Sequence, residues 1–279
     1  MSKKAIILRI TILLLVTSMI IPMFKGFSAA EIEENDIIKV DDSGGANYFI
    51  IQDAINAANH GDTIYVYSGT YFENIVIDKT INLVGEDKDT TIIDGSNMGD
   101  VITLASSSNG VNLTGFTIQN SGSGSYESGI DINSDYNTIA GNNIKNNEYG
   151  IALDLWGHNC KIFSNNFENN IYGILVYSVY PNNNTIYHNN FENNIINAYD
   201  DSNSNWTKDG QGNYWDDYNG TDNNDDGIGD TPYLIPGGST QDDYPLMNKE
   251  EHETPGFETI TIISAIIIAL IILKRKKTI

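Results

Sequence analysis

The feature that most restricts the fold of this sequence is an internal repeat between residues 137 and 197. Three copies follow one another there, and in each copy two Asn-Asn pairs flank one apolar residue. Ile139, Ile162 and Ile186 occupy the same position in the three copies, at steps of 23 and 24 residues. A repeat of this length indicates a solenoid, in which each unit packs on its neighbours.

Within each copy the apolar residues alternate over short stretches, which is the pattern of a β-strand. One circuit has room for three short strands and their turns, and successive circuits stack at the strand spacing of about 4.8 Å. Stacking places Asn143, Asn166 and Asn190 in one column, where their amides can bond along a ladder at a tight corner. The sequence therefore predicts an all-β fold, a right-handed single-stranded parallel β-helix. A leucine-rich repeat has a similar period but needs several leucines per unit, which are missing here.

Both ends of the predicted β-helix carry sequence suited to caps. Residues 50–58 have helical spacing and predict a short N-terminal capping helix over the first coil. An irregular C-terminal cap rich in Asp, Tyr and Trp is predicted over the last coil. Cys160 is the one cysteine, and its place in the repeat predicts a small core residue.

The two ends of the chain have the composition of targeting segments. A basic start, an apolar run and Ser28-Ala29-Ala30 predict a secretory signal peptide, with an N-terminal membrane anchor as the alternative. An apolar stretch followed by four basic residues predicts a C-terminal transmembrane anchor, or a sorting tail that is replaced by a lipid. We therefore expect an exported protein held at the cell surface. The predicted parts are a signal peptide (1–30), a parallel β-helix (31–205), a C-terminal cap (206–248), a linker (249–258), a transmembrane or sorting helix (259–273) and a basic cytoplasmic tail (274–279).

Charge excludes some partners of the predicted exported part. All 37 acidic residues lie between Glu31 and Glu258, where there are seven lysines and no arginine, so that part has a formal charge of −30. Such a surface repels nucleic acid and anionic polysaccharide. Polyuronate lyases and the related esterases of β-helical fold rely on arginine or lysine, so the lack of arginine counts against both.

Several segments resemble a known family. Gln52–Ala58, Gly61–Tyr71 and Asn82–Glu86 resemble the N-terminal coils of NosD-like and pectate-lyase-like β-helix proteins. Gly212–Tyr218 and Asp243–Leu246 resemble the end of archaeal NosD-like surface proteins, in which a Pro-Gly-Phe tail such as that at residues 255–257 directs sorting. The resemblance implies the fold, while the reaction stays open because such folds host lyases, hydrolases, esterases and proteins without known activity. The resemblance also implies copper delivery as a candidate function, because NosD is associated with copper delivery to nitrous oxide reductase.

Copper binding is not favoured by the residues, because copper sites need clustered His, Cys or Met. The four histidines lie far apart in the sequence, and Cys160 is predicted to point inward.

A glycosidase needs only two carboxylates. Aligning Gly129 with Gly150 puts Glu127 over Glu148 on neighbouring coils, where mutual repulsion would raise one pKa as a general acid requires. The alternative is that both are solvated side chains beside a loop.

An acidic loop in the C-terminal cap predicts a structural calcium site. Oxygen-bearing side chains stand at loop positions 1, 3, 5 and 9, with a glycine at position 6 for the sharp turn. The glutamate of an EF-hand at position 12 is missing, so the alternative is an acidic turn without metal. The predicted ligands are Asp222, Asn224, Asp226 and Asp230.

Aromatic residues in or near loops predict a carbohydrate-binding surface, with ordinary packing as the alternative. The predicted ligand-binding residues are Tyr149, Trp156, Tyr172 and Tyr177. The leading hypothesis is a non-enzymatic extracellular module that binds glycan or serves the envelope structurally. A polysaccharide-processing glycosidase with Glu127 and Glu148 as its acids is the first alternative, and a copper-delivery accessory protein is the second.

Overall fold

The computed structural model describes residues 37–124, 126–153, 156–177 and 182–252. The predicted signal peptide, the transmembrane or sorting helix and the basic tail lie outside these residues. Among the described residues, no helix has the length and apolar character needed to cross a membrane.

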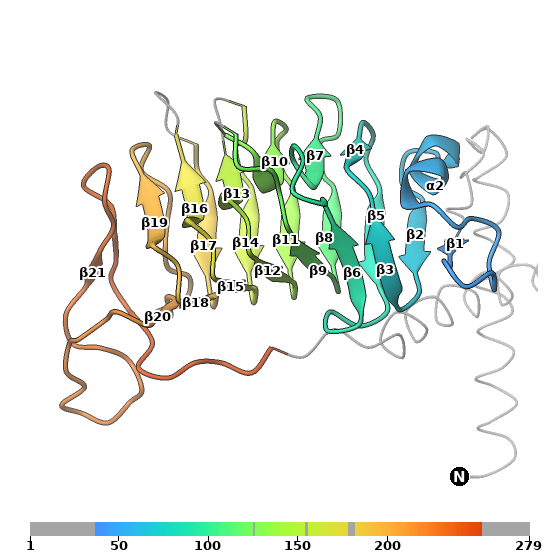
Figure 1. Ribbon diagram of the computed structural model, residues 1–279. Coiled ribbons are helices and arrows are strands. Elements are labelled where there is room, and N and C mark those ends of the chain that lie inside the picture. Colours follow the sequence, from blue (N-terminus) through green and yellow to red (C-terminus); the bar gives the residue numbers. More distant parts are fainter. Residues whose placement is uncertain (1–36, 125, 154–155, 178–181, 253–279) are drawn as a thin grey trace, which may run out of the picture. The chain divides into compact units, whose positions relative to one another are not determined.

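The described part is a right-handed parallel β-solenoid of about seven turns (Figure 1), which confirms the predicted fold class. The chain visits three parallel sheets in turn. The first sheet contains β1 (Ile37–Val40), β2 (Thr63–Val66), β5 (Asn82–Gly85), β8 (Asn112–Thr114), β11 (Thr138–Ala140), β14 (Lys161–Phe163) and β17 (Thr185–Tyr187). The second contains β4 (Ile75–Ile77), β7 (Ile102–Leu104), β10 (Ser128–Ile132), β13 (Tyr149–Leu153), β16 (Tyr172–Val176) and β19 (Ile196–Asp200). The third contains β3 (Gly69–Phe72), β6 (Thr91–Asp94), β9 (Thr117–Gln119), β12 (Asn143–Lys145), β15 (Asn166–Glu168), β18 (Asn190–Glu192) and β20 (Tyr214–Trp215).

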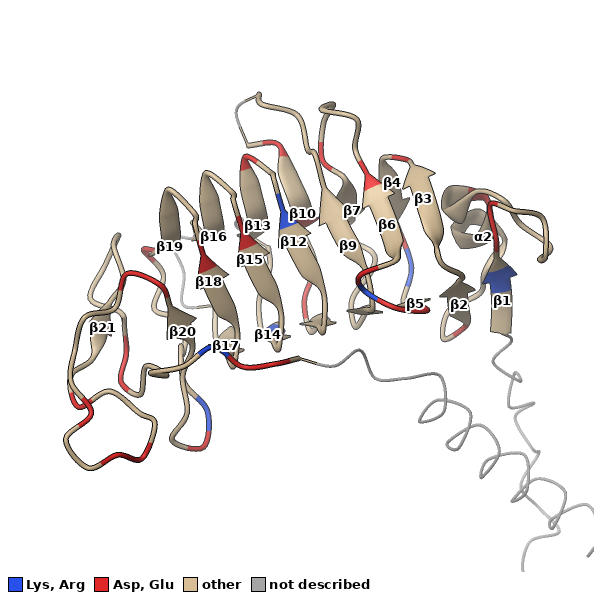
Figure 2. Cartoon of the chain, turned by 60° about the horizontal axis from the view of Figure 1, so that its bottom comes forward, with Lys and Arg blue, Asp and Glu red and all other residues tan. Residues whose placement is uncertain are grey.

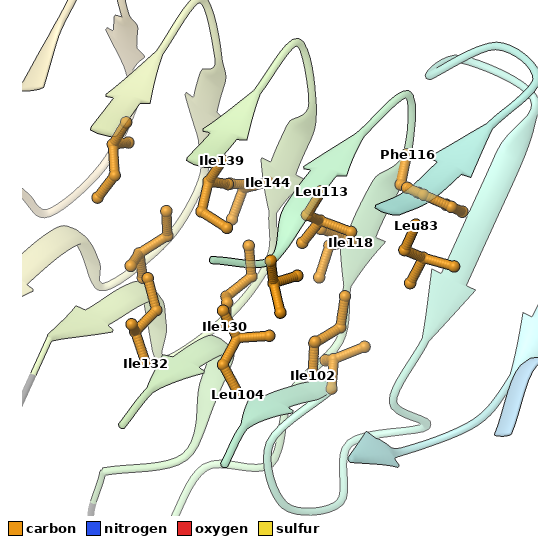
Figure 3. Packing of buried hydrophobic residues seen from close by; sticks show 14 of the residues in the cluster. Leu83, Ile102, Leu104, Leu113, Phe116, Ile118, Ile130, Ile132, Ile139 and Ile144 are labelled. Atoms are coloured by element: carbon orange, nitrogen blue, oxygen red, sulfur yellow. The ribbon is translucent and has the colours of Figure 1, made fainter. Parts of the chain in front are cut away.

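Residues that repeat in the sequence stack in register. Ile139 pairs with Ile162, and Ile162 pairs with Ile186, on neighbouring strands of the first sheet. One side chain in two points inward along each strand, so the interior is filled by columns of isoleucine, leucine, valine and phenylalanine (Figure 3). At the C-terminal end the column becomes aromatic, with Phe191 stacked between Phe167 and Trp215 at ring distances of 4.9 and 4.4 Å.

An inner ladder of asparagines fills one corner of the solenoid. Asn142, Asn165, Asn189 and Asn213 are fully buried, and each of the first three donates its Nδ2 to the Oδ1 of the next at 3.0 to 3.1 Å. The same Oδ1 atoms also accept backbone N–H groups, as Asn165 Oδ1 does from Asn142 N at 3.1 Å. The ladder thereby satisfies polar groups that would otherwise be buried without partners.

An outer ladder runs beside it on the third sheet. Asn166 Nδ2 donates to Asn143 Oδ1, and Asn190 Nδ2 donates to Asn166 Oδ1, both at 2.8 Å. This is the predicted column, and the strand pairing confirms it. The next corner is turned by Asn146, Asn169 and Asn193, whose φ angles of 55° to 57° are the left-handed conformation that asparagine tolerates.

The N-terminal end is closed by the helix α2 (Ile51–Ala57), as predicted. Its buried residues Ile51, Ala54 and Ile55 lie on the first coil. The helix has no side-chain cap of its own. Instead the Glu73 carboxylate, from the loop after β3, accepts the backbone N–H groups of Ile51 and Gln52 at 2.8 and 2.9 Å, and so satisfies two free donors at the helix start.

The C-terminal cap is organised around a buried carboxylate. It includes a short antiparallel hairpin, β21 (Tyr233–Leu234) and β22 (Gln241–Asp242), and the Tyr233 ring stacks on Trp215 at 4.2 Å. The Asp242 side chain accepts hydrogen bonds from Trp215 Nε1 at 2.9 Å and from Asn213 N at 2.7 Å. Burial raises the pKa of Asp242 to about 6, although these hydrogen bonds oppose the shift.

This carboxylate predicts a pH dependence of stability. The pKa of Asp242 is higher in the folded protein than its ordinary value of 3.8, so the fold binds the proton more tightly than the unfolded chain. Stability should therefore rise as the pH falls from 7 to 4, with a contribution of about 3 kcal/mol from this group. Urea unfolding at a series of pH values gives the free energy of unfolding as a function of pH. This free energy should change less with pH in Asp242→Asn than in the natural chain. An equal pH dependence of the two proteins would contradict the raised pKa of Asp242.

A C-terminal strap, residues 248–252, folds back along the third sheet. It includes the start of the segment predicted as a linker. Glu250 exchanges two backbone hydrogen bonds with the Asn190 side chain, at 2.7 and 3.1 Å, and its carboxylate bonds to His188 Nδ1 at 2.7 Å. Lys249 pairs with Glu192, and the backbone oxygen of His252 accepts a hydrogen bond from Lys88, which lies just before β6.

Candidate functional site

The candidate site includes residues on the outer face of the second sheet. Its inward positions are apolar, as in Ile174 and Val176, while the residue between them faces outward. In register, Ala152, Leu175 and Tyr199 form one outward row across β13, β16 and β19. At the start of β13 and β16, at the corner with the third sheet, Tyr149 pairs with Tyr172.

Three tyrosines form a column at this corner. Tyr149 stacks on Tyr172 with ring centroids 5.2 Å apart, and Tyr126, from the loop before β10, stacks on Tyr149 at 6.1 Å. Glycine is required behind the column, because a Cβ on Gly150 would lie 2.4 Å from the backbone oxygen of Gly173. The pairing of β13 with β16 places Tyr149 directly beside Tyr172.

The column borders a hollow of about 300 Å³, which we call the tyrosine groove. Tyr126 and Tyr177 are its most exposed members, at 67% and 51%. Because the stacked rings cover each other's faces, they offer a ligand mainly their edges and hydroxyl groups, together with the outer face of Tyr126. The residues that line the groove are Tyr126, Tyr149, Tyr172, Leu175, Tyr177 and Tyr199.

The Tyr149 hydroxyl at the centre of the column stays protonated at ordinary pH. The pKa of Tyr149 is raised by burial and further by the neighbouring Glu148 carboxylate and the tyrosines on either side. None of the described lining residues is charged, so they present hydroxyls and apolar carbon to a ligand. Figure 2 shows acidic residues, in red, on several turns of the solenoid.

The structure brings three of the four predicted ligand-binding residues together: Tyr149, Tyr172 and Tyr177 all line the groove. Trp156 is 65% exposed and does not line it. Sequence reasoning missed Tyr126, Leu175 and Tyr199. The first lies in an insertion that breaks the repeat, while the register of Tyr199 with Leu175 could have been found by extending the third copy.

The predicted acids Glu127 and Glu148 stand one residue before the paired positions Ser128 and Tyr149 of neighbouring strands. The Glu127 carboxylate accepts the backbone N–H of Gly124 at 2.6 Å, within its own loop. A further acid, Asp100, accepts the N–H of Ser128 at 2.7 Å. Burial raises the pKa of Asp100, and the negative charge of Glu127 adds to the shift. Asp100 is thus a carboxyl with a raised pKa beside this loop, and the sequence did not single it out.

In the predicted calcium loop, acidic side chains accept hydrogen bonds from backbone N–H groups of the same loop. The Asp222 carboxylate accepts N–H groups from Asp226 at 3.2 Å and Gly227 at 2.9 Å, and Asn224 Nδ2 donates to Asp226 at 3.0 Å. Asp230 accepts the backbone N–H of Asn223 at 2.9 Å.

A second hollow of about 400 Å³, which we call the end cleft, lies between the last coil and the cap. Asn197 Nδ2 donates to Asp216 Oδ1 at 3.0 Å and to Asp217 Oδ1 at 2.9 Å, and Tyr233 donates its hydroxyl to Asp217 Oδ2 at 3.2 Å. Within the described part of the chain, neither carboxylate has an ion-pair partner. The lining residues are Asn194, Ile195, Ile196, Asn197, Ala198, Asp216, Asp217, Tyr233 and Pro236.

Comparison with protein families gives one match, to the family described as periplasmic copper-binding protein (NosD), over residues 24–220. The match covers more than half of the chain. The protein belongs to the NosD family. The predicted resemblance to NosD-like β-helix proteins is thereby confirmed, and the periplasmic description agrees with an exported protein. No curated protein matches the NosD-family chain in sequence.

Solved structures resemble this NosD-family protein only distantly. Carrot pectin methylesterase has a TM-score of 0.41 at 15% identity, over 60% of this chain and 68% of that one. The Aspergillus niger pectin methylesterase has 0.35 at 15%, over 58% and 70%. Geobacillus virus E2 ORF18 has 0.31 at 18%, over 51% and 38%. At these values the likeness carries no information about reaction or ligand.

The side chains described here do not fit a bound copper ion. The described ranges contain no group of three His, Cys, Asp or Glu residues placed to hold a metal. His188 bonds through both ring nitrogens, to Glu250 and to Gln211, each at 2.7 Å. Burial raises the pKa of the Cys160 thiol to about 11, which keeps it protonated and a poor ligand.

Proposed function

We propose that this NosD-family protein is a non-enzymatic extracellular module that binds a neutral glycan in the tyrosine groove. The observation that supports the proposal is the groove itself, in which five tyrosines and one leucine line a hollow across neighbouring coils. Exposed aromatic hollows on a rigid scaffold commonly mark binding sites. The proposal includes attachment to the cell surface through residues 259–273, or through a lipid that replaces them.

The chemistry of the groove favours sugars. A pyranose ring has apolar C–H faces and a rim of hydroxyl groups, and the groove offers apolar carbon beside tyrosine hydroxyls that donate and accept hydrogen bonds. Recognition of uronates would need cations, and residues 31–258 contain no arginine. A neutral glycan avoids repulsion by the acidic surface.

The proposal is tested by binding of the full-length protein to an array of neutral, acidic and amine-bearing glycans, with parallel assays for released reducing ends. Saturable binding to neutral glycans without product supports a binding module. Absence of glycan binding, in a preparation shown to be folded by circular dichroism, overturns it.

Glycoside hydrolysis is the alternative that the register of Glu127 and Glu148 keeps open. If it operates, neutral polysaccharides release reducing ends, and Glu148→Gln abolishes the release while binding persists. Asp100→Asn is the matched variant for the carboxyl with the raised pKa. Product formation by the natural chain and loss of it in either variant would replace the binding-module proposal.

We also propose that the acidic loop of the cap binds calcium with a structural role. Asp222, Asn224, Asp226 and Asp230 would supply side-chain oxygens, and the loop already turns around the Asp222 carboxylate. Excess calcium should raise the melting temperature by several degrees relative to chelator, by stabilising the cap. Asp222→Asn should lose most of this increase, while Asp209→Asn, in another exposed loop, should keep it. An unchanged melting temperature of the natural chain would refute calcium binding.

A further inference from the structure

The tyrosine groove does not stop at the last coil. Tyr172 is followed on the neighbouring strand by Ile196, which lines the end cleft. Tyr199, on the floor of the groove, lies against the cap loop, because a Cβ on Gly237 would be 3.0 Å from its ring. Pro236, the residue before that glycine, lines the end cleft. Residues of β19 therefore line both hollows, Tyr199 in the groove and Ile196 in the cleft.

The two hollows differ in charge. The described residues that line the groove are uncharged, whereas Asp216 and Asp217 line the cleft. Among the described lining residues of both hollows there is no Lys, Arg or His. Both carboxylates accept hydrogen bonds from the neutral donor Asn197, which holds them in place without cancelling their charge.

The cleft also has an aromatic wall. Tyr233 is half-buried, its ring stacks on Trp215 at 4.2 Å, and its hydroxyl bonds to Asp217. A carboxylate pair beside an aromatic ring is the environment that an ammonium group prefers, through charge and cation–π attraction. A uronate or phosphate group would be repelled there by the two carboxylates.

We propose that the groove and the end cleft form one binding track along the solenoid axis, and that the cleft takes an amine-bearing sugar of the same glycan. The inference rests on the proposed function, because it is the groove that points to a glycan and the cleft then selects its chemical class. The ligand is a linear glycan that crosses the strands, with neutral rings along the tyrosine column and a cationic unit at Asp216 and Asp217.

The test compares two sets of oligosaccharides of the same length that differ in N-acetylation and hence in charge: N-acetylglucosamine oligomers and de-N-acetylated glucosamine oligomers. Isothermal titration calorimetry with the full chain, at mildly acidic pH and low salt, should show at least tenfold tighter binding of the amine-bearing set. Asp216→Asn/Asp217→Asn should abolish the preference and leave the affinity for the N-acetylated set unchanged. The matched control Asp53→Asn, on the capping helix at the other end, should keep the preference.

The outcomes separate the two proposals. If the N-acetylated set binds through the groove and the amine-bearing set binds no tighter, or if the preference survives in the double variant, the inference on the cleft is wrong and the groove stands. If neither set binds and the glycan array is also negative, the proposed function itself fails. Should the double variant unfold, Asp217→Asn alone provides the same comparison, because the asparagine oxygen can still accept the Tyr233 hydroxyl.

Discussion

Replacing Asn165 by alanine is expected to lower the free energy of unfolding by about 3 kcal/mol or more. The Asn165 amide is fully buried, and its Nδ2 donates to the backbone oxygens of Ile139 and Phe163 at 2.9 and 3.0 Å. Its Oδ1 accepts both the backbone N–H and the Nδ2 of Asn142 at 3.1 Å. The substitution leaves all of these partners buried without a replacement, and urea unfolding followed by circular dichroism measures the loss.

The neighbouring residue provides the control. Asn166 belongs to the outer ladder, where its partner Asn143 is half-buried and its partner Asn190 is buried but also bonded to Glu250 of the strap. Asn166→Ala should cost only about 0.5 to 1 kcal/mol, because Asn143 can bond to water and Asn190 keeps its bonds to the strap. Equal losses for the two variants would mean that the inner ladder has no special role.

Removing the centre of the tyrosine column should reduce glycan binding strongly. Tyr172→Ala deletes a ring that stacks on Tyr149 and lines the groove, so contact is lost and the column is interrupted. We expect the dissociation constant for neutral oligosaccharides to increase at least tenfold, which corresponds to about 1.4 kcal/mol. Titration calorimetry of the variant against the natural chain measures the change.

Two further variants show whether the effect belongs to the groove. Tyr136→Ala removes a tyrosine that is 64% exposed and lies outside the groove, and it should leave the affinity unchanged. Tyr172→Phe keeps the ring and removes the hydroxyl, so it separates the contribution of the hydrogen bond from that of the ring. If Tyr136→Ala weakens binding as much as Tyr172→Ala, the groove is not the site.

The fold was predictable because one short pattern recurs in register. The separation of Ile139 and Ile162 along the sequence fixes the number of residues in one coil, and the Asn-Asn pairs fix the corners. The stacking of Asn143 on Asn166 follows from these two features without any knowledge of distant contacts. In a repeat of this kind each coil meets mainly the next one, and local sequence determines most of the contacts.

The candidate site was only partly predictable, because part of it lies outside the repeat. The stacking of Tyr149 on Tyr172 followed from the alignment, but Tyr126 reaches the column from an inserted loop. The end cleft joins Asn197 of the last coil to Tyr233 of the cap hairpin, and no periodicity relates these two residues. The burial that sets the pKa of Asp100 likewise depends on a fold around it that its neighbours in sequence do not reveal.

The C-terminal strap changes how such a molecule responds to load. Coils that meet only their neighbours can peel off one at a time from a free end. Here Glu250 is bonded to Asn190 near the last coil, while His252 is bonded to Lys88 several strands away. A pull applied through the C-terminus therefore reaches these bonds together, as shear across several rungs, before it reaches the cap. The cap and the last coil therefore bear the load only after the strap contacts to Asn190 and Lys88 have broken.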